Sequence, residues 1–346
     1  MQQNKKKLCK RILLAVLAVV LVLLLGLLAV ISRGNTQLRL RPDEAPDLAD
    51  GDSWYWQDDH ILMADGVAYR PREHLINVLC IGLGTSSERE TSGFNRGMMP
   101  MADTFVLAVL DPAANHVTLL SIPRDTQTVL DSTHADSSLP ALTEKHLALQ
   151  YRYGGTDTPT CTQTTRDTVS RLLYDVGIHA AVTIDMDSIV VLADLLGGVP
   201  ITIPDDPWYC AYTGYQPGQW VSMDGPTALQ FVQYRDLSVP GSCEIRVERQ
   251  KLFADAILNW FYKAVRSNPG AILYCFQQMQ PYYYTDLDLT EITALGASLA
   301  QWNMQNISMR TLPGTVEKGV IYEEYHVDVP AARQMLLEIF YEPVQP

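Results

Sequence analysis

The chain has 346 residues, of which 47% are hydrophobic, and a formal net charge of −13 at pH 7. This length allows one large globular domain or two smaller ones, with ample apolar material for a core. Six of the 26 lysines and arginines lie in residues 1–33, which contain no Asp or Glu, so the rest of the chain carries 20 basic and 39 acidic side chains and a net charge of −19. That balance excludes a general nucleic-acid binder and a domain that lies flat on an anionic membrane.

The N-terminal residues predict a cytoplasmic tail and a membrane anchor. A basic cluster in residues 1–11 precedes Ile12–Ile31, in which all twenty residues are apolar or glycine. A helix of that length rises about 30 Å, which matches the hydrocarbon core of a bilayer. A cleaved signal peptide is the alternative, but its apolar region is only about 7–15 residues long and ends at small residues. The basic cluster predicts that residues 1–11 are cytoplasmic, that residues 12–31 cross the cell membrane once, and that everything after Arg33 is extracellular.

Residues 32–72 are predicted to form an extracellular stem or a small accessory segment. They are mostly polar and contain three prolines, which interrupt regular structure. The aromatic run Trp54-Tyr55-Trp56 lies in the middle of this segment. It predicts a small turn that packs against the neighbouring domain.

Three of the six cysteines, Cys161, Cys210 and Cys243, fall in loop-like sequence of the predicted extracellular region. Disulfides form in that compartment. A pair among the three is therefore allowed, but its connectivity stays open because spacing alone does not define it. The sequence has no Cys-x-x-Cys motif and no His/Cys spacing of the kind that binds zinc.

Apolar runs predict three strands at the start of the globular region, namely Leu75–Leu83, Thr104–Leu110 and Val117–Ile122. A turn at Asp111–Asn115 joins the second and third strands. Residues 126–162 follow no regular pattern and are predicted to be irregular.

Strands and helices then alternate along the chain. The pattern predicts strands at Ala180–Ile184, Val199–Ile203, Ile307–Leu312 and Val320–Tyr325, and helices at Thr164–Val176, Ser188–Leu196, Pro226–Tyr234, Glu244–Val265, Ile272–Gln280, Thr290–Trp302 and Pro330–Phe340. This alternation predicts an α/β fold, a three-layer α/β/α domain with a mixed central sheet over residues 73–343.

Charged residues stand at the ends of the predicted strands, where the active groups of such sheets gather. Asp103 lies at the start of the second strand, and Arg124 and Asp125 follow the third. These three residues are candidates for a catalytic site. For Asp125, a structural ion pair or a loop cap is an equally supported alternative.

The stretch Tyr234–Lys251 concentrates arginines in an otherwise acidic region. Arg235 precedes a Pro-Gly break, and Arg246, Arg249 and Gln250 share one face of the following helix through their i, i+3, i+4 spacing. A loop that folds Arg235 over the first helical turn gathers guanidiniums near the positive end of the helix dipole, as a phosphate requires. The alternative is a set of exposed arginines paired with neighbouring carboxylates.

Motifs in a fixed order connect these features with a known family. The segments in question are Asn77–Gly84, Ala102–Pro112, Leu120–Thr126, Tyr153–Gly155, Val182–Asp187, Leu195–Val199 and Asp224–Gln230, followed by Tyr234-Arg235 and the Arg-x-x-Arg-Gln pattern that begins at Arg246. From about Leu75 to the C-terminus, the chain resembles the LytR-CpsA-Psr enzymes of Gram-positive cell envelopes.

The resemblance implies a membrane-anchored extracellular phosphotransferase. Such enzymes transfer an anionic glycopolymer, for example teichoic acid or capsule, from an undecaprenyl-pyrophosphate carrier to peptidoglycan, typically to the 6-hydroxyl of N-acetylmuramic acid. The expected partners are the polyprenyl-pyrophosphate-linked glycopolymer, peptidoglycan and the membrane, and the expected cofactor is Mg²⁺. The resemblance also implies an apolar tunnel for the polyprenyl tail. The apolar faces Ile189–Leu196 and Leu252–Phe261 are candidates for it, with ordinary core packing as the alternative.

Motif position carries the family's functional roles to individual residues of this chain. The pyrophosphate ligands are expected to be Arg124, Arg235, Arg246 and Gln250, with Arg249 and Gln233 beside them. Asp103 is expected to hold the metal or to orient the site. The catalytic set is then Arg124, Asp103 and Asp125, and a carboxylate base for the acceptor hydroxyl would be Asp125 or Asp103.

Two departures from the family pattern bear on activity. Gly84 stands where the family usually has a metal-binding Asp, and Gln233 stands where it usually has an Arg. A neutral amide donates hydrogen bonds to phosphate but adds no charge. A pyrophosphatase that hydrolyses polyprenyl pyrophosphate is an alternative within the same chemistry. The two departures keep a further alternative open, a non-catalytic lipid-binding regulator of the envelope.

Overall fold

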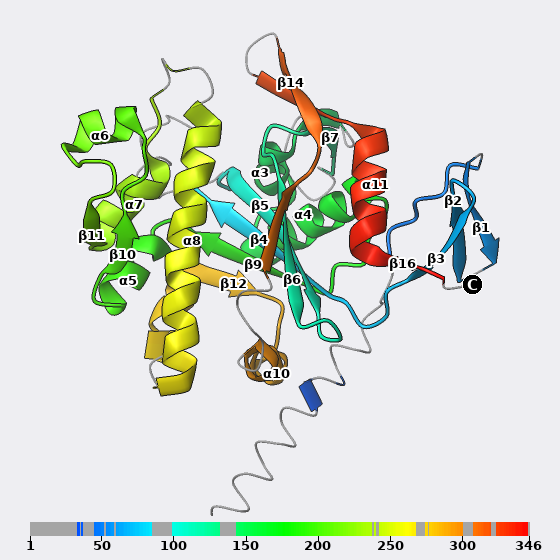
Figure 1. Ribbon diagram of the computed structural model, residues 1–346, viewed down its shortest axis with the longest axis horizontal. Coiled ribbons are helices and arrows are strands. Elements are labelled where there is room, and N and C mark those ends of the chain that lie inside the picture. The colour runs from blue at the N-terminus through cyan, green and yellow to red at the C-terminus, as the bar shows by residue number, and fades with distance from the viewer. Residues whose placement is uncertain are drawn as a thin grey trace, which may run out of the picture.

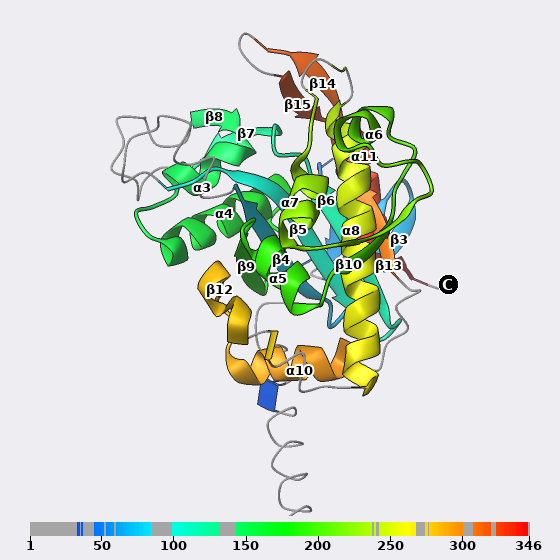
Figure 2. The ribbon, with the colours of Figure 1, turned by 90° about the vertical axis from the view of Figure 1, so that its left-hand side faces the viewer.

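The computed structural model describes residues 33–34, 36, 45–51, 53–58, 60–84, 99–131, 143–236, 239, 242–267, 274–275, 277–299, 307–319 and 323–344. A mixed six-stranded sheet lies at the centre of this region. Helix α8 lies over one face of the sheet and helices α3 and α4 over the other (Figures 1 and 2). The prediction of an α/β fold with a mixed central sheet is thereby confirmed.

The central sheet has the strand order β12-β9-β4-β5-β6-β13. Its strands are β4 (Ile76–Leu83), β5 (Ala102–Asp111), β6 (His116–Ile122), β9 (Ala180–Asp185), β12 (Tyr283–Thr285) and β13 (Ile307–Thr311). Strands β4 and β9 are parallel, as are β6 and β13, whereas β5 runs antiparallel to both of its neighbours. The carboxyl ends of β4, β6, β9 and β13 therefore meet the beginning of β5 at one edge of the sheet.

The turn between β5 and β6 fixes the register of these two strands. The Asp111 carboxylate accepts hydrogen bonds from the backbone N–H groups of Ala113 and Ala114, both at 2.9 Å. Asn115 closes the turn in the left-handed region, with φ of 49°, which Asn adopts more readily than most residues. The resulting register pairs Phe105 with Ile122 at the other end of the hairpin.

Aspartate caps and prolines define where several helices begin. Four helices follow an Asp whose side chain accepts a hydrogen bond from a backbone N–H of the first turn, and each has a Pro in that turn. They are α4 (Thr158–Leu172), α6 (Pro207–Thr213), α7 (Gly225–Gln233) and α11 (Val329–Phe340). This combination satisfies a donor that the helix leaves unpaired and fixes the backbone angle of the first turn.

The remaining elements complete the layers around the sheet. They are β7 (Gln127–Leu130), β8 (Thr143–His146), η1 (Leu147–Leu149), α3 (Gln150–Tyr153), α5 (Ser188–Leu195), β10 (Val199–Thr202), β11 (Trp220–Met223), α8 (Ser242–Ser267), η2 (Gln280–Tyr282), α10 (Leu289–Leu299), β14 (Gly314–Lys318) and β15 (Glu323–Val327). Strands β14 and β15 form an antiparallel hairpin. Of the strand predicted at Val320–Tyr325, residues 323–325 lie in β15 and residues 320–322 lie outside the described residues.

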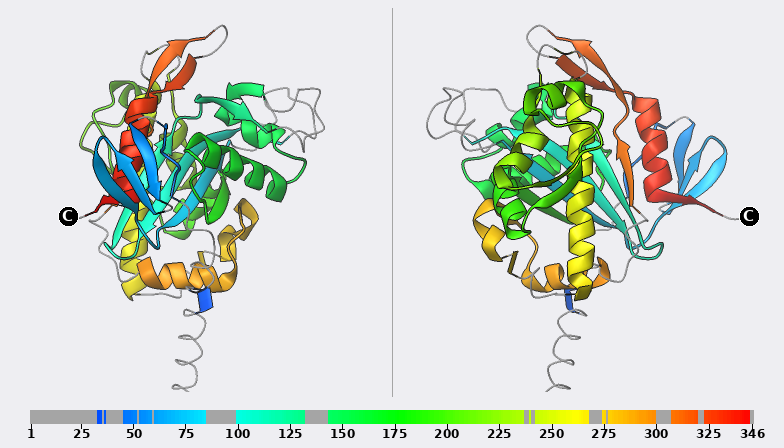
Figure 3. Two further views of the ribbon diagram at one scale, coloured as in Figure 1. Left: turned by 90° about the vertical axis from the view of Figure 1, so that its right-hand side faces the viewer. Right: turned by 60° about the vertical axis from the view of Figure 1, so that its left-hand side comes forward.

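The segment before the central sheet is more ordered than its polar composition suggests. Strands β1 (Trp54–Asp58), β2 (Ile61–Ala64) and β3 (Val67–Pro71) form a meander that pairs with the C-terminal strand β16 (Tyr341–Pro343). The Tyr341 hydroxyl donates to the Pro46 carbonyl at 2.5 Å. Figure 3 shows this accessory sheet beside α11 and next to the C-terminus.

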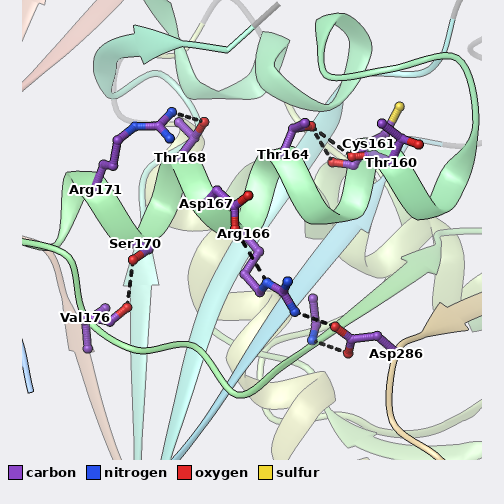
Figure 4. A network of polar contacts seen from close by, with 11 residues as sticks. Thr160, Cys161, Thr164, Arg166, Asp167, Thr168, Ser170, Arg171, Val176 and Asp286 are labelled. Atoms are coloured by element: carbon purple, nitrogen blue, oxygen red, sulfur yellow. Dashed lines mark hydrogen bonds and ion pairs between the residues drawn. The ribbon is translucent and has the colours of Figure 1, made fainter. Parts of the chain in front are cut away.

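Helix α4 fastens the short edge strand β12 to the sheet. Asp286, which follows β12, accepts from the Arg166 guanidinium at 2.5 Å and from the Ala181 backbone N–H of β9 at 2.9 Å (Figure 4). Further along α4, the Ser170 hydroxyl donates to the Val176 carbonyl at 2.8 Å and holds the turn that leads to β9. One carboxylate thus connects a helix and two strands.

Two sequence predictions need correction here. The described part of residues 126–162 is not irregular, because it contains β7, β8, η1, α3 and the first residues of α4. Helix α4 begins at Thr158 rather than at Thr164, since its capping residues lie ahead of the apolar pattern.

Two other predictions concern the anchor and the cysteines. The predicted membrane helix at 12–31 lies outside the described residues, and within the described part of the chain no helix has both the length and the apolar character needed to cross a bilayer. Cys161 and Cys210 are both free thiols, so they do not pair with each other. The side chain of Cys243 lies outside the described residues.

Candidate functional site

The strand-end residues predicted from the sequence meet at one edge of the central sheet. Asp103 lies two positions before Phe105 on β5, and Arg124 lies two positions after Ile122 on β6, so the Phe105–Ile122 pairing brings them opposite each other. The Arg124 guanidinium donates to Asp103 Oδ1. This ion pair is partly exposed, since the two side chains keep 31% and 20% of their accessible surface.

Arg124 also contacts the carboxylate that follows it. Its Nε lies 3.4 Å from Asp125 Oδ1, and His146 Nδ1 lies 3.5 Å from the same oxygen. The Asp125 side chain keeps 32% of its accessible surface and that of His146 keeps 18%. Two carboxylates, a guanidinium and an imidazole therefore form one cluster, made of Asp103, Arg124, Asp125 and His146, which we call the sheet-edge cluster.

Backbone hydrogen bonds hold the turn that carries Arg124 and Asp125. The carbonyl of Arg124 accepts from the Ala148 N–H at 2.8 Å, and that of Asp125 accepts from the Tyr325 N–H at 3.0 Å. Thr126 is fully buried, and its hydroxyl donates to the Pro123 carbonyl at 2.6 Å. Segments from η1 and from the β14–β15 hairpin thus fix the turn, which preorganises the two side chains.

The second group of predicted residues surrounds the end of α7 and the first turns of α8. Arg249 is 2% exposed, and its guanidinium donates to the Asp206 carboxylate at the start of α6. The same guanidinium donates to the backbone carbonyls of Phe231, at 2.8 Å, and Tyr234. It also lies 5.2 Å from the centroid of the Tyr209 ring.

This placement does not support the prediction that Arg249 contacts a pyrophosphate. Its donors are used within the protein, where a buried ion pair with satisfied hydrogen bonds fixes the packing of three segments. Arg249 is instead a structural residue that holds α6, the end of α7 and α8 together. Gln250 has a related role, because its side-chain amide donates to the Val232 carbonyl at 3.2 Å.

The other predicted ligands of this group are more accessible. Arg235 is exposed and Arg246 is half-buried. The amide of Gln233 contacts the sulfur of Met186 at 3.5 Å. Gln233, Tyr234 and Arg235 line one hollow of about 490 Å³, together with Val190, Tyr212, Pro226, Leu229 and Gln230.

The two groups lie on different elements but at the same end of the molecule. Helix α8 begins at the end where β7 and the β14–β15 hairpin lie (Figure 1), and the turn that carries Arg124 leads directly into β7. The first turns of α8 therefore lie at the end of the molecule that carries the turn after β6.

The apolar faces predicted to line a lipid tunnel are buried only in part. Ala193 of α5 is fully buried and Phe253 of α8 is 8% exposed. Both belong to a cluster with β10 and α7, and the half-buried Ile189, Leu196 and Ile257 pack against it. Leu252 of α8 is 37% exposed, and Val190 of α5 lines the hollow of about 490 Å³, so core packing accounts for only part of each face.

Asp103 is the carboxylate that the sequence predicts to bind magnesium at this edge. The described residues contain no group of three His, Cys, Asp or Glu side chains arranged around a metal position. Asp103 is the carboxylate nearest to Gly84 in strand register, because Leu83 pairs with Ala102. Magnesium often takes one or two carboxylates and completes its shell with phosphate oxygens and water, so Asp103 fits as a single protein ligand beside a bound pyrophosphate.

Sequence reasoning missed His146 and Asp206. His146 ends a four-residue strand in a segment predicted to be irregular, and it meets Asp125 only through the pairing of β7 with β8. Asp206 was identifiable as a helix cap from the Asp-Pro pair at residues 206–207, but nothing local indicates that it also receives Arg249, 43 residues further along the chain.

Comparison with known proteins identifies one family for most of the chain. Residues 64–339 match the model of the LytR_cpsA_psr family. Two curated relatives are TagU of Halalkalibacterium halodurans, 30% identical over 159 residues, and TagU of Bacillus subtilis, 29% identical over 159 residues. Both are named as polyisoprenyl-teichoic acid–peptidoglycan teichoic acid transferases. The matches cover 45% and 46% of this chain and 46% of each relative, so the chain spans about half the length of the curated relatives that it matches.

Solved structures share the fold. The crystal structure of Bacillus subtilis TagV superposes with a TM-score of 0.58 at 21% identity, covering 78% of this chain and 98% of the other. The structure titled TagT bound to LI-WTA superposes with a TM-score of 0.55 at 18% identity, covering 77% of this chain and 90% of the other. At these identities the likeness establishes the architecture of the domain, and the chemistry has to be argued from the residues.

Proposed function

Since the chain belongs to the LytR_cpsA_psr family, we propose that it is a transferase that moves an anionic glycopolymer from an undecaprenyl-pyrophosphate carrier to peptidoglycan. The acceptor in this proposal is the 6-hydroxyl of N-acetylmuramic acid. The names of the curated relatives support the substrate class. The observation that carries the proposal is the sheet-edge cluster, in which one arginine lies between two carboxylates at the functional edge of the sheet.

The cluster suits phosphoryl transfer to a hydroxyl. The leaving group is a polyprenyl phosphate, and negative charge grows on its bridging oxygen as the bond breaks. A preorganised guanidinium stabilises that charge and aligns the phosphate, and such groups are the main catalytic contribution in reactions of this kind. Arg124 has this role in the proposal, and Arg235 and Arg246 bind the remaining phosphate oxygens.

Asp125 is the base in this proposal. Its contacts with Arg124 and His146 are both made to Oδ1, which leaves Oδ2 to receive the proton of the acceptor hydroxyl. A positioned carboxylate commonly contributes about 10²–10⁴-fold to such a step. Asp103 faces Arg124 from the neighbouring strand and orients its guanidinium.

Magnesium is part of the proposal, with Asp103 as its protein ligand. When bound, Mg²⁺ would supply positive charge to the pyrophosphate oxygens. Gly84 removes the carboxylate that relatives usually place on the neighbouring strand. The proposal therefore includes a weak metal site that depends on the oxygens of the substrate.

The proposed location follows from the N-terminal sequence. The uncharged run Ile12–Ile31 and the basic cluster before it support a single membrane-spanning helix with a cytoplasmic N-terminus. The transferase domain would then lie outside the cell, where its acceptor is found. An anchor of this kind keeps the domain next to the bilayer that holds the lipid-linked donor.

One reaction mixture separates this proposal from the two alternatives. The full-length chain in detergent is incubated with a synthetic lipid-pyrophosphate oligosaccharide and peptidoglycan oligomers, with and without Mg²⁺. Oligosaccharide coupled to peptidoglycan supports transfer. Free sugar phosphate without coupled product identifies a pyrophosphatase, and donor binding without turnover identifies a lipid-binding regulator.

A further inference from the structure

We propose that His146 is a positioning residue for the transfer reaction, whose imidazole holds Asp125 with Oδ2 towards the acceptor hydroxyl. This inference rests on the proposed function, because it concerns the proton that the acceptor loses in that reaction. It assigns a role to a side chain outside every motif that the sequence singled out.

The contacts around Asp125 carry the inference. His146 Nδ1 lies 3.5 Å and Arg124 Nε lies 3.4 Å from Oδ1 of Asp125. Two nitrogen groups from different segments thus converge on one oxygen, which fixes the rotation of the carboxylate and directs the other oxygen away from them. Such contacts are often long in a site without substrate and shorten when the reacting complex forms.

The fold places His146 by backbone pairing rather than by chance contact. Strand β8 pairs with β7 so that His146 lies opposite Gln127, two residues after Asp125. The next residue, Leu147, donates its N–H to the Thr126 carbonyl at 2.9 Å and is fully buried. Because the backbone on both sides of the contact is fixed, the imidazole is held beside the carboxylate without an ordering cost when substrate binds.

The charges around the imidazole suit a hydrogen-bond donor. Asp125 faces it, and Arg124 and Asp103 lie beyond that carboxylate. Lys145, the neighbouring residue on β8, is exposed and points to the opposite side of the strand. Nδ1 donates in one neutral tautomer of histidine as well as in the cation, so the role does not require a charged ring.

The proton transfer that His146 assists is balanced as follows. The acceptor hydroxyl oxygen forms a bond to the phosphorus atom attached to the sugar, and the bond from that phosphorus to the bridging oxygen breaks. The bridging oxygen leaves with the electron pair as part of polyprenyl phosphate. The hydroxyl proton passes to Asp125 Oδ2, and no group is oxidised or reduced.

Variants at position 146 test the role. We expect His146→Ala to lower kcat about tenfold to a hundredfold, a part of the usual contribution of a positioned base, with little change in the KM for the lipid donor. His146→Asn should recover most of the loss, since its amide places an N–H close to the position of Nδ1. His60→Ala, on the exposed turn of the accessory sheet, is the matched control and should leave kcat unchanged.

A double-mutant cycle distinguishes positioning from a general structural effect. If His146 acts through Asp125, then adding His146→Ala to Asp125→Ala causes no further loss, because the group that it positions is already gone. A further loss of similar size in that background would overturn the inference. An unchanged kcat in His146→Ala would also overturn the inference. In either case the proposed function is retained as long as the wild type catalyses transfer.

A measurement that needs no turnover covers the remaining cases. The wild-type protein and the Asp125→Asn variant are labelled with ¹⁵N-histidine and compared. The Nδ1 resonance of His146, which is assigned by its loss in His146→Asn, should differ between them. An unchanged resonance contradicts the contact even if the alanine variant fails to fold. If the wild type transfers nothing from the donor, the proposed function fails. The inference then fails because the reaction is absent, which is distinct from a failure of the contact between His146 and Asp125.

Discussion

Arg124 and Asp103 form an ion pair across the ends of two antiparallel strands. The register that pairs Phe105 with Ile122 sets this contact, so an apolar core pairing determines the geometry of a polar site. Asp103 lies on β5 and Arg124 in the turn after β6, and the charged ends of both side chains stay partly exposed. A fixed charge with an open side is the arrangement that phosphate recognition requires.

The first prediction concerns the guanidinium of the sheet-edge cluster. Replacing Arg124 with Ala should lower kcat/KM for transfer by about 10²–10³-fold, as expected for the loss of a preorganised group at the developing charge. The measurement is the initial rate of coupling of labelled oligosaccharide to peptidoglycan. The control is Arg310→Ala. Arg310 lies on β13 and forms an exposed ion pair with Glu338 of α11, and its loss should leave the rate unchanged. Wild-type activity in Arg124→Ala would remove Arg124 from the site.

The second prediction concerns the buried pair of Arg249 with Asp206. Arg249→Ala leaves a carboxylate that is 3% exposed without its partner, and this should lower the free energy of unfolding by about 3–5 kcal/mol. Urea titration followed by tryptophan fluorescence measures the change. Arg310→Ala, in its exposed pair, should cost only about 0–1 kcal/mol. Equal small losses in both variants would contradict the structural role assigned to Arg249.

The third prediction concerns the charge missing at Gln233. Gln233→Arg should lower the KM for the lipid-pyrophosphate donor about fivefold, since a charged hydrogen bond exceeds a neutral one by about 1 kcal/mol. Gln334→Arg adds the same charge at an exposed position of α11, outside the hollow that Gln233 lines, and serves as the matched control. An equal effect of both substitutions would indicate general electrostatic attraction, and no effect of either would place Gln233 outside the donor site.

The fourth prediction concerns metal dependence. Chelation with EDTA should lower the transfer rate, and added Mg²⁺ should restore it, because the ion supplies charge to the pyrophosphate oxygens. Asp103→Asn should raise the Mg²⁺ concentration needed for half of the maximal rate. Asp167→Asn, at a half-exposed side chain of α4, should not. A rate that EDTA leaves unchanged would contradict a magnesium site at Asp103.

The fifth prediction concerns stability at high pH. Burial raises the pKa of Cys80 from 9.0 to about 11 and that of Cys161 from 9.0 to about 12, so the folded protein keeps protons that the unfolded chain loses. The stabilisation is complete below about pH 9 and disappears as the pH rises through the folded pKa values. The free energy of unfolding in urea should therefore fall between about pH 9 and pH 11. Cys80→Ala should reduce this fall, and an identical slope in that variant would contradict the role of the thiol.

The sequence predicted the centre of the fold well because its signals there are local. The apolar run at β4 ends at glycines, that at β5 ends at an Asp-Pro turn, and that at β6 ends before Pro123, so their limits are visible. Helix α4 was predicted to begin too late because its first turns bury threonines rather than aliphatic residues. Thr162 is 2% exposed and bonds to Thr183 of β9 at 2.8 Å, a contact that helical hydrophobic periodicity does not register.

The residues of the candidate site that lie at strand ends could be predicted from the sequence. Those placed by contacts between distant parts of the chain could not. Asp103, Arg124 and Asp125 follow from the rule that active groups gather at strand ends. The helical spacing of Arg246, Arg249 and Gln250 was a sound guide to one shared face, but it cannot tell which part of that face turns inward. Arg249 turns inward because it pairs with Asp206. The position of His146 is set by the pairing of β7 with β8.

The most direct test of the proposed function is ³¹P NMR of the complete reaction with lipid-pyrophosphate donor, peptidoglycan oligomers and the full-length protein. The proposal predicts one new phosphodiester on peptidoglycan for each polyprenyl phosphate released, and neither signal in the Arg124→Ala variant. Release of polyprenyl phosphate with sugar monophosphate, and with no phosphodiester on peptidoglycan, would contradict it.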